Sequence, residues 1–176
     1  KPGTKSVVHR LRPLGYRVGL AGKVHVGPAE VMPFDHVPGF ETACSKAVAT
    51  HDVAGIRDYF SRDKAQPFCL FVCSIHPHAP WTLGDPSPFD PAKLKLPPHW
   101  VDTPETRQDY VRYLAEVALL DRQVGDILKA LDESGQKDNT VVLFCGEQGP
   151  QFPCAKWTCY HAGLHSALLV RWPGRI

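Results

Sequence analysis

The stretch that decides the fold covers residues 103–149 and reads TPETRQDYVRYLAEVALLDRQVGDILKALDESGQKDNTVVLFCGEQG. Its first part predicts a long helix, because Asp102 or Thr103 can cap the first turn and Pro104 suits that turn. Apolar residues then recur at spacings of three and four, which is typical of one helical face. This predicted stripe consists of Tyr110, Leu114, Val117, Leu120, Val124, Leu128 and Leu131. Gly135 is a usual helix stop.

The segments on either side of this helix predict strands and one more helix. We expect strands at 17–21, 67–75, 139–144 and 166–172, a helix at 51–63, and a long proline-stiffened loop at 82–104. The run 67–75 is apolar throughout, as in strands buried on both faces of a parallel sheet. We expect the strands at 139–144 and 166–172 to be buried as well. The order of elements therefore predicts an α/β fold with a mainly parallel sheet flanked by helices. A length of 176 residues favours a single domain.

Composition and chain ends narrow the functional classes. The net charge is +2 with both signs scattered, which gives no indication of a nucleic-acid partner. No apolar run approaches the roughly 18 residues that a membrane span needs. The chain begins with Lys1 rather than Met and stops directly after a strand-like run. We therefore expect it to be part of a longer protein, truncated at both ends.

Polar side chains follow three of the predicted strands. These are Lys23 and His25 after the first, His76 and His78 after the second, and Glu147 and Gln148 after the third, with Lys156 further on. Each pair alone is a weak signal: Lys-x-His is usually solvated, Glu-Gln is most often a turn, and His-x-His also suits a zinc, copper or iron pair. Ligand crevices of open α/β sheets lie at the carboxyl ends of strands. We therefore expect these side chains to converge on one crevice.

The chemistry of this set points to an anionic ester. Ammonium and imidazole N–H donors stabilise charge that develops on the oxygens of a sulfate or phosphate group. Carboxylate and amide oxygens, such as those of Glu147 and Gln148, suit Ca²⁺ or Mg²⁺ rather than zinc. The residues themselves thus predict metal-assisted hydrolysis or transfer at an anionic ester.

Four stretches, in their order and spacing, resemble one family. They are GYRVGLAGKVHVG (15–27), PFCLFVCSIHPHAPW (67–81), the segment 96–149 and KWTCYHAGLHSALLVRWPGRI (156–176). The chain resembles the formylglycine-dependent sulfatases of the alkaline-phosphatase superfamily, and GPQFPCAKWTCY (149–160) is similar to the sulfamidase-like branch. The resemblance implies the fold of that superfamily, present here in incomplete form.

The resemblance also implies roles for individual residues. Lys23 matches a lysine that contacts both nucleophile and sulfate, and His25 matches a histidine that helps to release sulfate from the nucleophile. His78 matches a histidine that contacts the sulfate and the leaving oxygen, and Lys156 matches a lysine near the bridging oxygen. His76 lies outside the motif, and we expect it to be a packed or loop histidine.

Glu147 and Gln148 stand where the family usually has Asp followed by Asn or His as Ca²⁺ ligands. Each side chain is one methylene longer than Asp or Asn, a change that Ca²⁺ tolerates better than Mg²⁺ does. We therefore expect Ca²⁺. The Cys/Ser-x-Pro-x-Arg motif, which carries the formylglycine nucleophile, and the early Asp-Asp pair are not in this sequence. We expect both upstream, and we expect the chain alone to be inactive.

The resemblance implies a sulfatase that hydrolyses a sulfate ester or a sulfamate in a sulfated small molecule or glycan. It also implies a periplasmic, lysosomal or secreted location. Two alternatives remain open: a phosphonate or phosphodiester hydrolase of the same superfamily, and a non-catalytic homologue that binds sulfated glycans. A fragment without a stable fold of its own is a further alternative.

Overall fold

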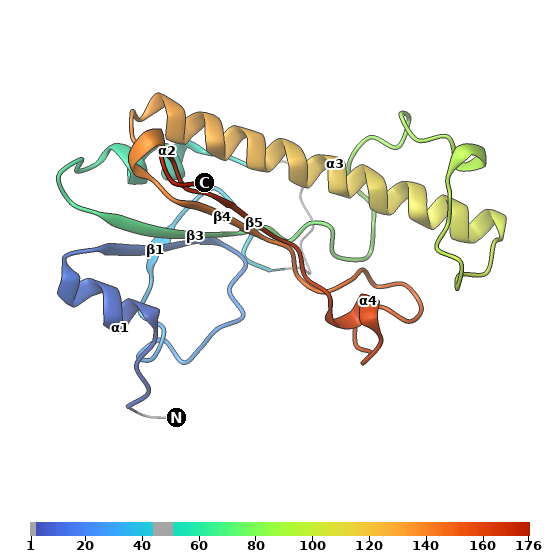
Figure 1. Cartoon of the computed structure of the whole chain (residues 1–176), viewed down its shortest axis with the longest axis horizontal. Helices are drawn as coiled ribbons and strands as arrows, with labels where there is room; N and C mark the ends of the chain where they lie inside the picture. The colour runs from blue at the N-terminus through green and yellow to red at the C-terminus, as the bar shows by residue number, and fades with distance from the viewer. Residues whose placement is uncertain (1–2, 44–50) are drawn as a thin grey trace. The chain divides into compact units, whose positions relative to one another are not determined.

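A computed structural model describes residues 3–43 and 51–176. Its contacts divide the chain into two compact units. Unit 1 comprises Lys1–Ile75 and Gln123–Gln136, and unit 2 comprises His76–Arg122 and Lys137–Ile176. The long helix α3 (Pro104–Glu133) therefore gives its first part to unit 2 and its last part to unit 1 (Figure 1). None of the described helices is long and apolar enough to cross a lipid bilayer.

Unit 1 contains, within the described residues, a parallel sheet of three strands in the order β2–β1–β3. Its elements are α1 (Val7–Leu11), a 3-10 turn (Arg12–Leu14), β1 (Arg17–Gly22), β2 (Asp35–Val37), α2 (Ala54–Ser61) and β3 (Phe68–Cys73). Figure 1 shows β1 and β3 side by side, with Arg17 opposite Phe68 and Gly22 opposite Cys73. The predicted parallel sheet and α/β class are thus confirmed, whereas β2 was not predicted.

The core of unit 1 lies between β1 and α2. Val18 of β1 and Ile56 and Tyr59 of α2 are all buried. Gly19 makes this packing feasible, because a Cβ atom there would lie 2.9 Å from the Tyr59 ring. Burial raises the pKa of Tyr59 to about 12, with a smaller contribution from the charge of Asp35.

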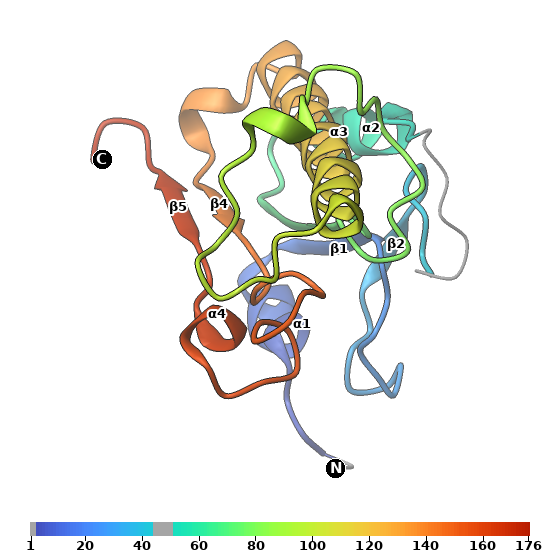
Figure 2. The same ribbon diagram turned by 90° about the vertical axis from the view of Figure 1, so that its right-hand side faces the viewer.

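An exposed ion pair links α2 to the last part of α3. Nη2 of Arg57 lies 2.8 Å from Oε2 of Glu133, and Figure 2 shows the two helices beside each other. Such a surface pair contributes about 0–1 kcal/mol. Burial of the apolar side chains of α2, rather than this pair, therefore provides most of the stability at this helix.

Unit 2 combines the first part of α3 with a short sheet and long loops. Its other elements are 3-10 turns at Pro91–Lys93 and Lys137–Asn139, β4 (Val142–Cys145), α4 (His161–Leu164) and β5 (Leu168–Arg171). β4 and β5 pair antiparallel, with Val142 opposite Arg171. Between residues 82 and 103 the turn Pro91–Lys93 is the only regular element. The long loop predicted there is thus confirmed.

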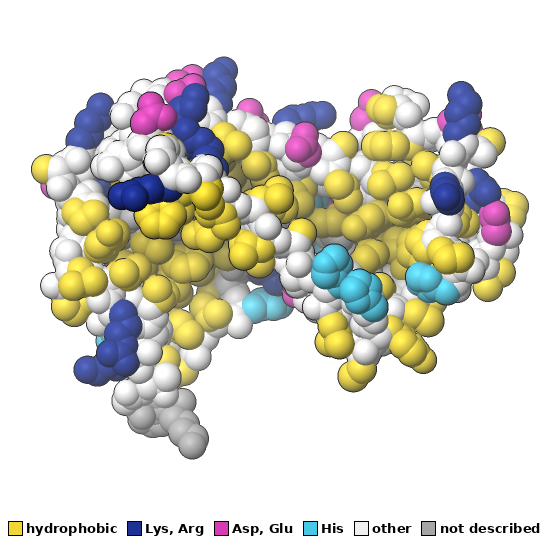
Figure 3. Space-filling model, viewed as in Figure 1, with side chains coloured by type: hydrophobic (Ala, Val, Ile, Leu, Met, Phe, Trp, Pro, Cys, Tyr) yellow, Lys and Arg dark blue, Asp and Glu magenta, His cyan; other side chains and the backbone are white. Residues whose placement is uncertain are grey.

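The strands predicted at 139–144 and 166–172 are present as β4 and β5, but the prediction that they are buried was wrong. Leu143 is 65% exposed, Leu168 is 61% exposed and Leu169 is 66% exposed. The reason is that β4 and β5 pair only with each other within the described residues, so no further strand or layer covers their apolar side chains. Figure 3 shows apolar side chains gathered over these two strands.

Helix α3 begins and ends as predicted. Thr103 caps it, because the backbone N–H of Thr106 donates to Oγ1 of Thr103 at 3.2 Å. Asp102 does not cap and instead accepts two hydrogen bonds from the guanidinium of Arg107. Gly135 follows the helix with a φ of 73°, a conformation that glycine adopts without a steric penalty.

The buried face of α3 differs from the predicted stripe. Leu131 of the predicted stripe is buried, but Leu128 is exposed. The deeply buried residues Val111, Ala115 and Leu119 lie outside the stripe. The buried face also holds two polar residues, Glu116 and Gln123, whose amide oxygen accepts from Ser74 at 2.7 Å. A prediction from the spacing of apolar residues overlooks the small and the polar residues of this face. For this reason the predicted stripe differs from the buried face.

Candidate active site

Lys23 and His25 lie in unit 1, in the loop that follows β1. Gly22 closes the strand with a φ of 87°, and a Cβ atom there would lie 2.2 Å from the carbonyl oxygen of Cys73. The backbone N–H of Lys23 donates to that same oxygen at 2.8 Å. Only glycine permits this close approach. It fixes the backbone of Lys23 at the carboxyl ends of β1 and β3.

The side chains of this loop differ in exposure. Lys23 is half-buried and His25 is exposed. Burial raises the pKa of the Cys73 thiol, and the positive charge of Lys23 partly offsets this rise. The Lys23 ammonium therefore acts electrostatically on the end of β3, at the edge of the sheet where the sequence predicts the crevice.

His78 lies in unit 2, in the loop that follows β3. Its Nδ1–H donates to the carbonyl oxygen of Ala79 at 2.6 Å. This bond leaves Nε2 as the ring atom available for other contacts. The N–H of Ala79 in turn donates to Oε1 of Gln151 at 2.8 Å, and the ring of Trp81 stacks on Phe152 with centroids 4.5 Å apart. The His78 loop and the segment around Gln151 therefore lie side by side.

Glu147, Gln148 and Lys156 lie in the loop between β4 and α4. Nζ of Lys156 donates to Oε2 of Glu147 at 3.2 Å. Only 11% of the Lys156 side chain is exposed, against 62% for Glu147. The loop is closed by backbone bonds, among them one from Gly149 to the carbonyl of Ala162 at 3.0 Å. A largely buried lysine is thus held against a solvent-facing carboxylate.

Two residues in the left-handed backbone region flank Lys156. Cys154 has a φ of 62° and Trp157 has a φ of 68°. Non-glycine residues rarely adopt such values and pay a steric cost of about 1–3 kcal/mol, which occurs most often at functional sites. No sequence signal predicted this conformation.

Unit 2 thus brings together four of the six predicted site residues. Lys156 contacts Glu147 directly, Gln148 follows Glu147, and the loop of His78 is bonded to the same region through Gln151. Lys23 and His25 belong to unit 1. Their convergence with the other four stays a prediction.

Two residues near the site were not predicted. Gln151 is the acceptor for Ala79. Glu116 of α3 is buried and accepts a hydrogen bond from Nδ1 of His76 at 3.1 Å. His76 itself is buried, as expected for a packed histidine. The one available signal for Glu116 was its position, because it shares a helical face with Leu119 and Gln123 at spacings of three and seven.

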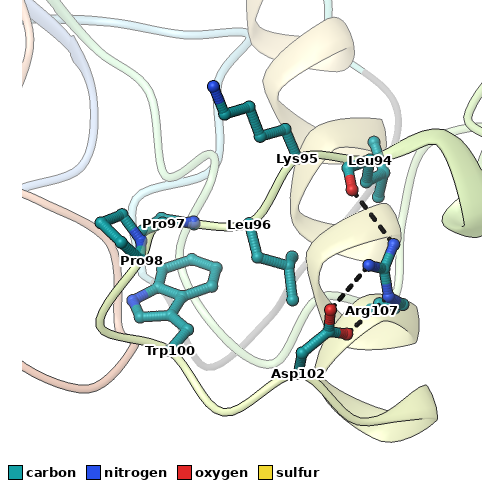
Figure 4. A pocket seen from close by; sticks show the side chains of 8 residues that line it. All are labelled: Leu94, Lys95, Leu96, Pro97, Pro98, Trp100, Asp102 and Arg107. Carbon is teal, nitrogen blue, oxygen red and sulfur yellow. Dashed lines mark hydrogen bonds and ion pairs between the residues drawn. The ribbon is translucent and has the colours of Figure 1, made fainter.

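A pocket of about 460 Å³ lies within unit 2, and none of these residues is among those that line it (Figure 4). Arg107 lies in its wall, and its guanidinium bonds Asp102 and the carbonyls of Pro91 and Leu94. Side-chain hydrogen bonds from Arg107 hold the pKa of Asp102 below its ordinary value. None of the predicted site residues is among the described residues that line this pocket, and the guanidinium of Arg107 is already hydrogen-bonded. We therefore interpret the pocket as a feature of the packing of the loop and not as part of the candidate active site.

The donor set at Glu147 and Gln148 fits a hard cation in kind. Carboxylate and amide oxygens are Ca²⁺ ligands, but Ca²⁺ takes about 6–8 oxygens, of which these two residues supply a part. In the described part of the chain, no group of three or more His, Cys, Asp and Glu side chains is arranged to hold a metal ion. The Lys156 ammonium beside Glu147 shows that this carboxylate pairs with a positive charge.

Comparison with known proteins gives one consistent family. A family model described as Sulfatase matches residues 2–176. The human N-sulphoglucosamine sulphohydrolase is 28% identical over 188 residues, which cover 90% of this chain and 37% of that protein. An ulvan-active sulfatase of Formosa agariphila is 28% identical over 176 residues, covering 96% of this chain and 33% of that protein. The chain thus spans about a third of the length of these curated relatives.

A solved structure shows the same fold. The phosphonate monoester hydrolase SpPMH from Silicibacter pomeroyi superposes with a TM-score of 0.62 at 18% identity, covering 99% of this chain and 54% of that chain. At this level of identity the likeness concerns the fold, which agrees with the α/β arrangement of unit 1.

Proposed function

This chain belongs to the sulfatase family of the alkaline-phosphatase superfamily, and from that membership we propose that the complete protein hydrolyses a sulfate ester or a sulfamate. We also propose that residues 1–176 form part of a single sulfatase catalytic domain. The observation that carries the proposal is the arrangement in unit 2, where buried Lys156 meets Glu147 beside the loop of His78. The similarity to human N-sulphoglucosamine sulphohydrolase supports a sulfamate as well as an ester.

Electrostatic stabilisation of the sulfate group is the main task that these residues perform. Lys23 and Lys156 provide ammonium donors to the sulfate oxygens, and charge that develops there is stabilised most strongly where water is excluded. The small exposed fraction of the Lys156 side chain meets that condition. His78 keeps Nδ1 on the carbonyl of Ala79, so Nε2 is the ring atom that contacts the leaving oxygen.

His25 acts at the other end of the reaction. Its exposed position after β1 lets a proton pass between the ring and water. In this proposal it helps to expel sulfate after the ester bond has broken. A formylglycine hydrate, expected upstream of this chain, supplies the nucleophile that attacks sulfur.

Sulfatases are generally metal-dependent, and we propose Ca²⁺ for this protein. Glu147 and Gln148 would hold it through their side-chain oxygens, together with ligands from outside this chain. The ion supplies charge stabilisation for the sulfate oxygens. The Lys156 ammonium would then contact both Glu147 and the substrate.

The alternative activity is hydrolysis of a phosphonate or phosphodiester, which the fold of the phosphonate monoester hydrolase accommodates. Sulfate and phosphonate oxygens call for the same donors. We therefore propose to assay the complete protein with an aryl sulfate, a sulfamate, an aryl phosphonate and a phosphodiester that share one leaving group where the chemistry allows. We expect the highest kcat/KM with the sulfate or sulfamate, and turnover of the phosphorus esters alone would contradict the proposal.

The control for that assay is the 176-residue chain itself. We expect it to show no turnover, because the nucleophile motif is not in its sequence. If the complete protein binds sulfated glycans but does not turn them over, that result would instead indicate the non-catalytic homologue.

A further inference from the structure

A buried carboxylate on α3 holds both ends of the loop that carries His78. Glu116 is 1% exposed. Its Oε1 accepts from the backbone N–H of Thr82 at 3.0 Å and of Leu83 at 3.2 Å. Its Oε2 lies 3.1 Å from Nδ1 of His76. Both oxygens are therefore bonded to the segment 76–83, one to its start and the other to its end.

Such an arrangement is costly unless it is well satisfied. Burying a carboxyl group removes it from water at a large cost, and good hydrogen bonds must offset that cost. Backbone N–H groups that donate to a carboxylate form charge-assisted bonds, which are stronger than neutral ones. Glu116 receives two of these from adjacent residues, and a third contact from His76. An apolar side chain at this helix position would leave the N–H groups of Thr82 and Leu83 without this acceptor.

The backbone beyond the loop leaves room for little movement. Gly84 has a φ of 82°, and a Cβ atom there would lie 2.4 Å from the carbonyl oxygen of Ala115. The chain therefore passes directly over the residue that precedes Glu116. His78 lies between the two anchored ends, and its neighbour Ala79 is bonded to Gln151.

We propose that Glu116 is a positioning residue for the reaction: it fixes segment 76–83 on α3 and thereby sets the place of the His78 ring. The inference rests on the proposed function, in which His78 contacts the sulfate and the leaving oxygen. A displacement of about 1 Å in such a group lowers a rate by about 100-fold. Glu116 acts through His78 and does not itself touch the substrate.

A double-mutant cycle in the complete protein tests this role. We expect Glu116→Ala to lower kcat about 10–100-fold with little change in KM, since the group that it displaces works mainly in the transition state. In a His78→Ala background the same substitution lowers kcat less than about 3-fold, because residues that act as a unit are not additive. A role in overall stability alone would give the same loss in both backgrounds, and that result overturns the proposal.

The variant Glu116→Gln tests whether the carboxylate itself is needed or only an oxygen that accepts hydrogen bonds from segment 76–83. The amide oxygen still accepts from Thr82 and Leu83, while the amide N–H₂ group faces Nδ1 of His76. We expect kcat to lie between the wild type and Glu116→Ala. The matched control is Glu133→Ala on the same helix, whose carboxylate pairs with Arg57 at the surface. It leaves kcat unchanged in both backgrounds.

Amide hydrogen exchange tests the anchor without turnover. We expect the N–H groups of Thr82 and Leu83 to exchange slowly in the wild type and in Glu133→Ala, and at least about 10-fold faster in Glu116→Ala. Unchanged exchange overturns the proposal. A wild-type protein without turnover of any sulfate contradicts the proposed function instead, and the exchange rates then decide whether Glu116 anchors the loop.

Discussion

The backbone around Lys156 has an unusual conformation that restricts where its ammonium group lies. The left-handed residues Cys154 and Trp157 on either side impose a backbone that unconstrained residues avoid. The loop also binds the N–H of Lys156 to the carbonyl of Pro150 at 3.1 Å. The conformation of the backbone thus places the Lys156 ammonium beside Glu147, although lysine has a flexible side chain.

Replacing Lys156 tests whether this ammonium works on the substrate. We expect Lys156→Met in the complete protein to lower kcat/KM for an aryl sulfate about 100–1,000-fold, the range for the loss of one oxyanion donor. Met preserves much of the side chain's length and apolar contact. Steady-state kinetics with an aryl sulfate measures the loss.

The matched control is Lys129→Met, which removes an exposed lysine from α3. Its Nζ lies 4.0 Å from Glu133 at the surface, so we expect less than about 2-fold change in kcat/KM, as for weak surface pairs. A Lys156→Met protein as active as this control would exclude Lys156 from the site.

The packing of α2 on β1 leaves one buried phenol, the side chain of Tyr59. Among the described residues the Tyr59 hydroxyl has no hydrogen-bond partner, and the ring lies against Gly19. Burial favours the neutral form, which is why the pKa of Tyr59 rises to about 12. Stability gained from this group is fully present below pH 10, the ordinary tyrosine value.

The sign of the pH effect follows from that shift. As pH rises from about 10 to about 12, the unfolded state loses the proton before the folded state does, so the free energy of unfolding falls. Two pKa units correspond to about 3 kcal/mol. We expect Tyr59→Phe to lack this loss. Denaturant unfolding of the wild type and the variant between pH 8 and 12 measures the difference.

Tyr160→Phe is the control for that series, because Tyr160 is exposed. Its unfolding curve should follow that of the wild type at every pH. Parallel loss of stability in the wild type and in Tyr59→Phe would show that other groups cause the alkaline transition.

Elements with strong local signals were predictable from the sequence. Helix α3 has a cap at Thr103 and a stop at Gly135, and β3 is a continuous apolar run, so their positions follow from local chemistry. Strand β2 spans Asp35–Val37 with only Val37 buried, which gives no periodic pattern. The exposure of β4 and β5 depends on which strands pair with them, and pairing is a long-range property that hydrophobicity does not encode.

In the candidate active site, too, some features were predictable from the sequence and others were not. The positions of His78, Glu147 and Lys156 after strands were predictable, because strand ends can be located in the sequence. The hydrogen bonds of Glu116 and Gln151 were not, because they join residues 34 and 72 positions apart. Such contacts become visible only when the loops are placed in space.

In the whole protein, the proposed Ca²⁺ site needs ligands in addition to Glu147 and Gln148. The chain spans 37% of the human sulphohydrolase that it matches. Glu147 and Gln148 offer two of the six to eight oxygens that Ca²⁺ takes. We expect the complete protein to bind Ca²⁺ at least about 100-fold more tightly than the 176-residue chain, since each ligand lost weakens a site.

Calorimetric titration of both proteins with CaCl₂ measures this ratio. Glu147→Ala in the complete protein should reduce the affinity toward that of the chain, whereas Glu133→Ala should leave it unchanged. Equal affinity of the chain and the complete protein would contradict the assignment of further ligands outside residues 1–176.

The exposed leucines of β4 and β5 have a practical consequence for work with this chain. A short apolar strand pair that faces water favours self-association of the protein in solution. Leu143 lies opposite Val170 and Leu169 lies opposite Phe144, so the two leucines point to opposite faces of the strand pair. A charged residue at either leucine would interrupt the apolar surface of that leucine's own face. We therefore expect the tendency of the isolated chain to self-associate to depend on these exposed leucines.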